Sequence, residues 1–160
     1  MNDTLSIYPS KEEAERNITQ LFQIQEDLYK TGARNFMFID VPPIDRAPCF
    51  NYARKGPPDF LLEIQEIYTT WNNILHSHTR SFHTKHPDTT ILMFSSWDVF
   101  SEILDCPGKF GFEEVHTRRA GLEGGMWMDQ LHPTSRTHEI LADRVKEFLD
   151  SFPAYQVTES

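Results

Sequence analysis

The sequence FMFIDVPP at residues 36–43 decides the fold class of this 160-residue chain. Its first six residues are mostly apolar and alternate little, a pattern typical of a β-strand that is covered on both faces. Pro42 and Pro43 end the strand, because proline has no N–H to donate to a sheet. The segment TILMF at Thr90–Phe94 has the same composition. Residues 36–41 and Thr90–Phe94 are therefore predicted to be parallel neighbours in one sheet, with helices on both faces.

Four segments with helical spacing surround the two strands. The first begins with a capping box at residues 10–13 (SKEE), in which serine and glutamate satisfy each other's backbone N–H groups, and Gly32 is placed to end it. The second helix is expected to follow the loop at residues 44–58 and to end at His86. The third is expected to start at a cap, Ser96, and to run through Leu104. The last is expected to begin at Thr134 or Ser135. The predicted buried positions are Ala14, Ile18, Leu21, Phe22, Leu28 and Tyr29 in the first helix, Leu61, Ile64, Tyr68, Trp71, Leu75 and Phe82 in the second, and Leu141, Val145, Phe148 and Leu149 in the last. Helices that alternate with strands predict a parallel α/β sheet.

The two strands make a thin core for a parallel sheet. A chain of 160 residues has the length of one domain. Two parallel strands between helices leave exposed sheet edges, which favour aggregation. We therefore expect this chain to be part of a larger sheet, and to be marginally stable or prone to aggregate by itself.

Composition excludes several classes of partner. The net charge is −9, which argues against nucleic acid and anionic membranes, since both favour a basic surface. No apolar stretch approaches the ~20 residues that span a bilayer. The start of the chain, MNDTLSIYPS, has neither the basic segment nor the apolar segment of a signal peptide. Cys49 and Cys106 fit no metal-site spacing, and two free structural thiols are expected.

The sequence WMDQLHPT at residues 127–134 carries the strongest signal of chemistry. Histidine changes its charge near neutral pH, so His132 can act as a general base or acid. A nearby carboxylate such as Asp129 can hold the imidazole in one tautomer and stabilise its protonated form. Spacing alone leaves a second interpretation open, in which Asp129 caps a turn and His132 is a surface loop residue.

Three segments together carry a family resemblance. DQLHPTSRTHEILADRVKEFL at residues 129–149 resembles the last conserved block of the SGNH/GDSL hydrolases, D-x-x-H-P-[ST] followed by a helix with a Leu-Ala pair. LYKTGARNFMFIDVPPIDRAP at residues 28–48 resembles the family's helix, strand and Pro-Pro turn. CPGKFGF at residues 106–112 resembles its Asn-Pro-x-x-Tyr-Gly-Phe segment, with Cys106 in place of Asn. The resemblance is greatest to fungal carbohydrate esterases.

The resemblance implies a fold, a chemistry and a set of residues. The fold is part of a three-layer α/β/α, flavodoxin-like domain with a parallel sheet: residues 1–150 form the C-terminal part of the hydrolase domain and 151–160 a tail. His132 would deprotonate a serine and Asp129 would orient His132. Met1-Asn2-Asp3 resembles the end of the Gly-x-Asn-Asp block, so Asn2 would donate to the oxyanion. No metal or organic cofactor is implied. The substrate would be a small-molecule ester or an acetylated carbohydrate, and a full-length member would be extracellular.

The family's nucleophile block is absent from this sequence. There is no Gly-Asp-Ser, and the resemblance covers only the later half of the family domain. Ser95-Ser96 lies between a strand and a helix, as a nucleophile does in a nucleophile elbow, but lacks flanking glycines. We therefore expect no useful esterase activity from this chain alone. The alternative is a truncated or degenerate, catalytically inactive protein that at most binds carbohydrate.

Other polar residues receive weaker expectations. His76, His78, His83 and His86 form a loose cluster for which a solvated helix end is favoured over a metal site. His116 is expected at the surface. Asp45 and Arg46 follow the Pro-Pro turn, where they would either line a substrate cleft at the carboxyl ends of the strands or be ordinary loop residues.

Overall fold

The structure, a computed structural model, describes residues 9–51 and 56–152 apart from the side chain of Pro58. In chain order its elements are α1 (Lys11–Lys30), β1 (Asn35–Ile39), the short 3-10 helices η1 (Ile44–Arg46) and η2 (Pro48–Phe50), α2 (Pro58–Lys85), β2 (Thr90–Phe94), α3 (Ser96–Asp105), the 3-10 helix η4 (Pro107–Phe110), α4 (Glu114–Arg118) and α5 (Ser135–Asp150). The predicted alternation of helices and strands is confirmed. The short helices η4 and α4 were not predicted from the sequence.

The two strands of the described residues pair in parallel, as predicted. The register aligns Phe36 with Ile91 and Ile39 with Phe94. β1 ends at Ile39, two residues before the predicted end, because Val41 has other partners. The backbone N–H of Val41 donates to Oδ1 of Asn72 on α2 at 2.9 Å, and its carbonyl accepts from Nδ2 of Asn72 at 2.9 Å. The side chain of Asn72 thus leads the chain away from the sheet.

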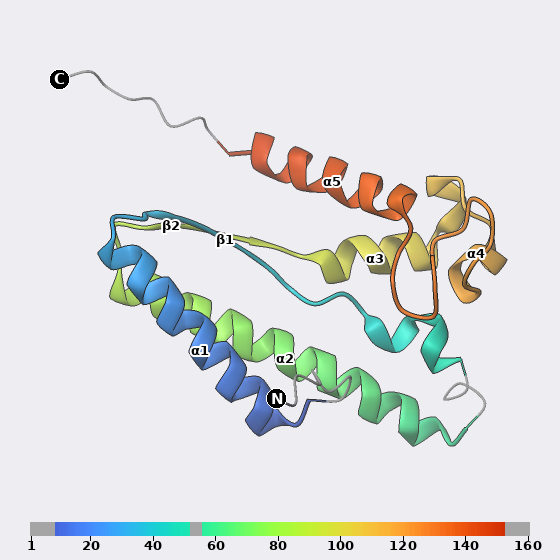
Figure 1. The fold of residues 1–160 in the computed structure, drawn as a ribbon, viewed down its shortest axis with the longest axis horizontal. Coiled ribbons are helices and arrows are strands. Elements are labelled where there is room, and N and C mark those ends of the chain that lie inside the picture. Colours follow the sequence, from blue (N-terminus) through green and yellow to red (C-terminus); the bar gives the residue numbers. More distant parts are fainter. Residues whose placement is uncertain (1–8, 52–55, 153–160) are drawn as a thin grey trace.

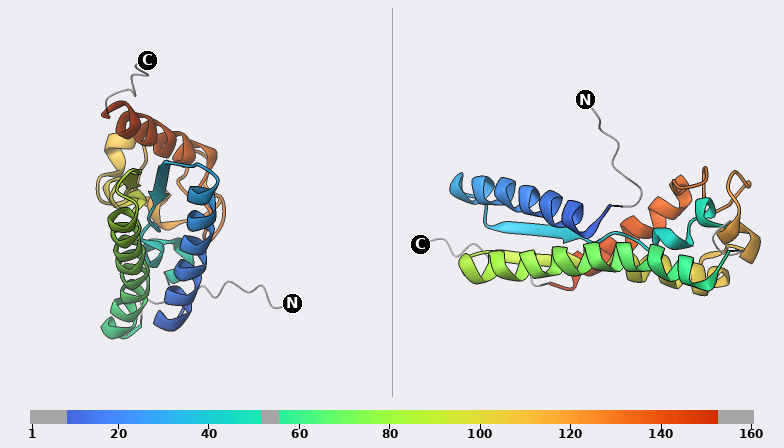
Figure 2. Two further views of the ribbon diagram at one scale, coloured as in Figure 1. Left: turned by 90° about the vertical axis from the view of Figure 1, so that its left-hand side faces the viewer. Right: turned by 90° about the horizontal axis from the view of Figure 1, so that it is seen from below.

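Helices α1 and α2 lie side by side on one face of the sheet (Figure 2). The ring centroids of Phe22 and Phe38 are 5.1 Å apart, as are those of Phe36 and Phe82, so both helices contact β1 through aromatic side chains. The predicted burial of Leu21 and Leu28 is wrong, since these side chains are 37% and 45% exposed. Only one face of α1 packs against the sheet and against α2, and these two leucines lie on a different face of the helix.

Helix α5 lies on the opposite side of the sheet (Figure 1). The rings of Phe94 and Phe148 make an edge contact with centroids 5.4 Å apart. Coverage on this side is incomplete, because Ile39 of β1 remains 48% exposed. The predicted burial of Leu149 is also wrong, since this side chain is 43% exposed. A sheet of two strands is too narrow to cover the whole apolar face of α5.

The helix starts follow the capping signals closely. Both hydrogen bonds of the Ser10–Glu13 capping box are present. Thr134 caps α5 by accepting from the N–H of Thr137. The prediction that Ser96 caps α3 is wrong by one residue: Ser95 accepts from the N–H of Asp98, while Ser96 turns inward.

Two of the four clustered histidines, His78 and His86, hold α2 against α1. His78 Nε2 is 3.1 Å from Oε1 of Glu15, and His86 Nε2 is 3.0 Å from Oε1 of Glu26, so both bridge α2 to α1. The expectation of a solvated cluster is therefore wrong for His78 and His86, because α1 packs on that face of α2. His83 is exposed, as expected.

Two further sequence expectations concern thiols and membranes. Cys49 and Cys106 are both free, as expected. Over the residues that the structure describes, no helix combines the length and apolar character required to cross a membrane.

The packing of α1 generates a stability prediction. Phe22 is buried against Phe38 and Phe82, whereas Ile24 on the same helix is 58% exposed. Phe22→Ala should lower the free energy of unfolding by roughly 3–5 kcal/mol, because it leaves a cavity. The matched control Ile24→Ala should change it by less than about 0.5 kcal/mol. Urea unfolding followed by circular dichroism measures both, and equal losses would contradict this packing.

Candidate active site

The loop from Met126 to Thr134 is closed by its own backbone. The N–H of Met128 donates to the carbonyl of His132 at 2.8 Å, and the N–H of Thr134 donates to the carbonyl of Met126 at 2.9 Å. Two threonine hydroxyls attach the loop to the start of α5: Thr134 Oγ1 donates to Gly125 O at 2.8 Å and Thr137 Oγ1 to Met126 O at 2.9 Å. The capping residues of α5 therefore also determine the shape of the loop.

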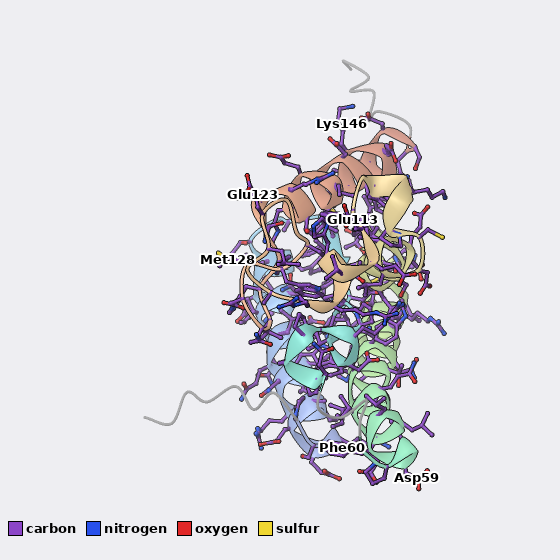
Figure 3. The ribbon with its side chains drawn as sticks, turned by 90° about the vertical axis from the view of Figure 1, so that its right-hand side faces the viewer. Asp59, Phe60, Glu113, Glu123, Met128 and Lys146 are labelled. Atoms are coloured by element: carbon purple, nitrogen blue, oxygen red, sulfur yellow. The ribbon has the colours of Figure 1, made fainter. Side chains whose placement is uncertain are left out.

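Successive side chains of this loop point in opposite directions. Trp127 is buried, and its Nε1–H donates to the carbonyl of Thr117 at 2.9 Å. Met128 is exposed and projects outward from the loop (Figure 3). The indole of Trp127 thus anchors the loop in the core, and the residues that follow lie at the surface.

Asp129 is held by three hydrogen bonds from its own loop. Its Oδ1 accepts from the backbone N–H groups of Leu131 at 2.8 Å and His132 at 2.7 Å, and its Oδ2 is 2.8 Å from Nδ1 of His132. The two backbone N–H groups, followed by the imidazole, lower the pKa of Asp129 from 3.8 to about 2. The carboxylate is therefore ionised at any ordinary pH.

The position of Asp129 determines the tautomer of His132. An ionised carboxylate can only accept a hydrogen bond, so Nδ1 of His132 carries the proton that it donates. In the neutral imidazole, Nε2 then has a free lone pair. The imidazole is largely exposed, and its Nε2 forms no hydrogen bond with any described residue. His132 is thus oriented on one side and open to a reacting group on the other.

The Asp129–His132 pair lies at the carboxyl end of β1. His132 and Pro133 line a cavity together with Ile39, Asp40 and Pro42, which end and follow β1. The predicted contact between the two side chains is present. Asn2, the third residue assigned to the site, lies outside the described residues.

Asp40 is a structural residue that the sequence analysis left without a role. It is buried, and its Oδ1 accepts from Ser96 Oγ at 3.0 Å and from the N–H of Trp97 at 2.9 Å. Its Oδ2 accepts from Ser95 Oγ at 2.8 Å. The carboxylate therefore joins the end of β1 to the start of α3. A carboxylate directly after an apolar strand was the available signal.

Arg136 is a second residue that sequence reasoning missed. Its guanidinium donates to the carbonyls of Phe110 at 3.0 Å, Gly111 at 2.9 Å and Gly124 at 3.1 Å. It also lies over the ring of Phe112, 4.5 Å from the centroid. Arg136 thus fastens the first turn of α5 to the segments that precede the loop. Its place directly after the Pro-Thr-Ser cap gave no indication of these distant partners.

The remaining candidates lie away from the pair. Arg46 pairs with Asp105 at 2.6 Å, and neither Asp45 nor Arg46 lines the cavity next to His132. His116 is half-buried and accepts from the N–H of Glu113, so the surface expectation is only partly right. Within residues 9–51 and 56–152, no group of three or more His, Cys, Asp or Glu side chains is arranged to hold a metal ion.

Comparisons with known proteins match most of the chain. The sequence model of the GDSL-like Lipase/Acylhydrolase family matches residues 1–145. The chain is 25% identical over 120 residues to an acetylesterase of Thermothelomyces thermophilus, covering 75% of this chain and 39% of the relative. It is 25% identical over 150 residues to a GDSL esterase/lipase of Arabidopsis thaliana, covering 80% and 40%. It is 22% identical over 152 residues to a thermolabile hemolysin of Vibrio parahaemolyticus, covering 81% and 35%. The chain spans about two fifths of the length of these relatives.

The hydrogen bonds of Asp129 generate a titration prediction. Because the folded pKa is lowered, these bonds stabilise the loop fully above the ordinary value of 3.8, and this contribution is lost as the pH falls through about 2. In a pH titration followed by the carboxyl carbon chemical shift, Asp129 should have its midpoint near pH 2. In His132→Ala, the midpoint should stay below 3.8, because the two backbone donors, which contribute most, remain. A wild-type midpoint at the ordinary value would contradict the geometry.

Proposed function

Since this chain belongs to the GDSL-like lipase/acylhydrolase family, we propose that the Asp129–His132 pair is the proton-transfer unit of a carboxylic ester hydrolase. One observation carries the proposal: the carboxylate of Asp129 holds Nδ1 of His132 at 2.8 Å, while Nε2 forms no hydrogen bond with a described residue and His132 lines a cavity. A carboxylate–imidazole pair of this kind activates hydroxyl nucleophiles in unrelated hydrolases.

The proposed reaction has two stages. Nε2 of His132 takes the proton of a serine hydroxyl while the serine oxygen bonds to the ester carbonyl carbon. The tetrahedral intermediate collapses, the bond to the alcohol oxygen breaks, and Nε2–H gives its proton to the leaving alcohol. Water then attacks the acyl-enzyme in the same way and releases the acid. Asp129 stabilises the imidazolium that exists between the proton transfers, and this chemistry requires no metal or organic cofactor.

Asn2 is the proposed donor to the oxyanion. A side-chain amide can stabilise the negative oxygen of a tetrahedral intermediate, provided that it is held in place before the reaction. Support comes from the match of Met1-Asn2-Asp3 to the Gly-x-Asn-Asp block, and the family match begins at residue 1.

The nucleophile is proposed to be a serine outside this sequence. Among the described residues, no hydroxyl group is hydrogen-bonded to His132. Ser96 lines the same cavity, but it is buried and its hydroxyl donates to Asp40. Ser95 is occupied in the same way. Both serines support the structure at the carboxyl ends of the strands, which leaves them unsuited to attack an ester.

The substrate is proposed to be a small-molecule ester, and the whole protein is proposed to act outside the cell. The relative named acetylesterase favours an acetyl ester, such as an acetylated carbohydrate. The relative named esterase/lipase favours a longer acyl chain. The mainly apolar lining of the cavity next to His132 supports the second of these possibilities.

A second function, binding without catalysis, is favoured by the lack of an activated hydroxyl among the described residues. In that case the chain would be a truncated or degenerate member of the family that at most binds carbohydrate. It would retain the Asp129–His132 pair as a structural turn, held by the backbone N–H groups of Leu131 and His132. The two functions predict different ester hydrolysis rates once a serine nucleophile is added to the chain.

The test compares the 160-residue chain with a longer version in which a Gly-Asp-Ser block precedes residue 1, using p-nitrophenyl acetate. The longer version should hydrolyse the ester and the chain alone should not. In the longer version, His132→Ala should lower kcat by about 10³-fold or more, and Asp129→Asn by about 10²-fold or more. His83→Ala, an exposed histidine on α2, is the matched control and should leave the rate unchanged.

Two results would contradict the proposal. Equal rates for the longer version and its His132→Ala variant would mean that His132 is not the base. A chain alone that is as active as the longer version, and that loses activity in His132→Ala, would place the nucleophile within this sequence. Ser96→Ala would then be the next variant.

A further inference from the structure

Three consecutive carbonyls where the His132 loop begins accept hydrogen bonds from side chains at the start of α5. The three bonds run from Thr134 Oγ1 to Gly125 O at 2.8 Å, from Thr137 Oγ1 to Met126 O at 2.9 Å, and from Arg136 Nη1 to Gly124 O at 3.1 Å. Arg136 also bonds to a second segment, because its Nη2 donates to the carbonyls of Phe110 at 3.0 Å and Gly111 at 2.9 Å, at the end of η4. The guanidinium therefore joins the start of the loop, the end of η4 and the first turn of α5.

The neighbours of Arg136 leave a space that fits a guanidinium. Gly111 has a φ of 71°, a left-handed backbone conformation that glycine adopts more readily than other residues. A Cβ at Gly111 would lie 2.5 Å from Nη2 of Arg136, so a side chain there would displace the guanidinium. In addition, Cζ of Arg136 lies 4.5 Å from the centroid of the buried ring of Phe112. Stacking on this ring while bonding to carbonyls of two segments requires the planar, forked side chain of arginine.

We propose that Arg136 is a positioning residue for His132: it holds the start of the loop and thereby sets where the imidazole lies relative to the end of β1. The inference rests on the proposed function and adds a residue that acts through the loop backbone. The contact between Asp129 and His132 is made within one turn, so it does not depend on Arg136. The position of the whole turn does, because the carbonyl that Arg136 holds belongs to Gly124, just before the loop begins.

The position of His132 matters because Nε2 must come within hydrogen-bonding reach of the serine that it deprotonates. A displacement of about 1 Å can lower the rate of an enzyme by about 10²-fold. A carbonyl that accepts from a charged donor is held more strongly than one that accepts from a neutral hydroxyl. Among the three attachments at the start of the loop, the bond from Arg136 to Gly124 is therefore the strongest.

The first experiment measures amide hydrogen exchange in the 160-residue chain by NMR, which requires no activity. Two hydrogen-bonded amides are compared: the N–H of Thr134, which closes the loop, and the N–H of Thr90, at the start of β2. In Arg136→Gln, Thr134 should exchange about tenfold faster or more, because a charged donor to the loop is lost, whereas Thr90 should be unchanged. The carboxyl group of Asp129 should still titrate near pH 2, since the donors that lower its pKa lie in its own turn.

Further variants test the space around the guanidinium. Gly111→Ala keeps the arginine but places a Cβ 2.5 Å from its Nη2, so it should also accelerate exchange at Thr134. In the Arg136→Gln background the same change should add nothing to that rate. Arg144→Gln is the matched control, because Arg144 lies on the same helix and over an aromatic ring but pairs with carboxylates, and it should leave Thr134 unchanged.

A second substitution keeps the test valid if Arg136→Gln does not fold by circular dichroism. Arg136→Lys then replaces it, because lysine keeps the charge but lacks the fork that reaches both segments. Exchange at Thr134 should then rise about threefold or more.

The second experiment measures p-nitrophenyl acetate hydrolysis by the longer version that carries the Gly-Asp-Ser block. Arg136→Gln should lower kcat about tenfold or more and leave KM within about twofold, because it moves the base without changing how the ester binds. Arg144→Gln should leave both constants unchanged. A residue that only stabilises the fold would leave the kcat of the folded enzyme at its wild-type value.

The inference is overturned if Thr134 exchanges equally fast in the wild type and in Arg136→Gln, or if Thr90 accelerates as much as Thr134. It is also overturned if Arg136→Gln keeps the full kcat while His132→Ala loses activity, in which case the proposed function stands. If the longer version hydrolyses no ester, the proposed function is wrong, and the exchange rates decide by themselves whether Arg136 holds the loop.

Discussion

The parallel pairing of β1 with β2 is the constraint on which the rest of the structure depends. Parallel strands cannot be joined by a tight turn, so the chain must return from the end of β1 to the start of β2 through a long crossover, here α2. The crossover brings both carboxyl ends to one edge of the sheet. Asp40, which follows β1, can therefore reach Ser95 and Ser96, which follow β2. That contact fixes the start of α3 and one wall of the cavity beside His132.

In the candidate site, the contact between Asp129 and His132 is local in the sequence, whereas the segments around it come from distant parts of the chain. Asp129 and His132 are three residues apart, and among the described residues the hydrogen bonds to the carboxylate of Asp129 all come from within that turn. The imidazole is therefore oriented by sequence-local geometry alone. Its setting is tertiary: Trp127 anchors the loop to α4, Thr137 ties it to α5, and the end of β1 faces it across the cavity. An imidazole that is oriented locally and placed by distant packing fits the role proposed for His132, in which other segments would supply the nucleophile and the oxyanion donor.

Incomplete burial is the other general feature of the molecule. Leu21, Ile24 and Leu28 are exposed on α1, and Ile39 is exposed on the α5 side of the sheet. Exposed apolar side chains at these positions agree with membership of a family in which the matched relatives are much longer than this chain. Ile39 also lines the cavity next to His132.

The sequence by itself determined the four long helices, the two strands and the Asp129–His132 contact, because each depends on short-range signals. The alternation of helices and strands indicated the parallel pairing. Apolar runs mark the strands, capping residues mark the helix starts, and a spacing of three residues places carboxylate and imidazole within one turn. Only the tertiary structure decided which apolar positions are buried: Leu21, Leu28 and Leu149 carry the helical pattern but meet no neighbour that covers them. It also decided the partners of His78, His86 and Arg136 and the cavity beside His132. The physical reason is that burial and long-range contacts depend on which surfaces meet after folding. Residues as far apart as Asp40 and Ser96 are brought together by the packing of whole elements, and no local pattern in the chain encodes that distance.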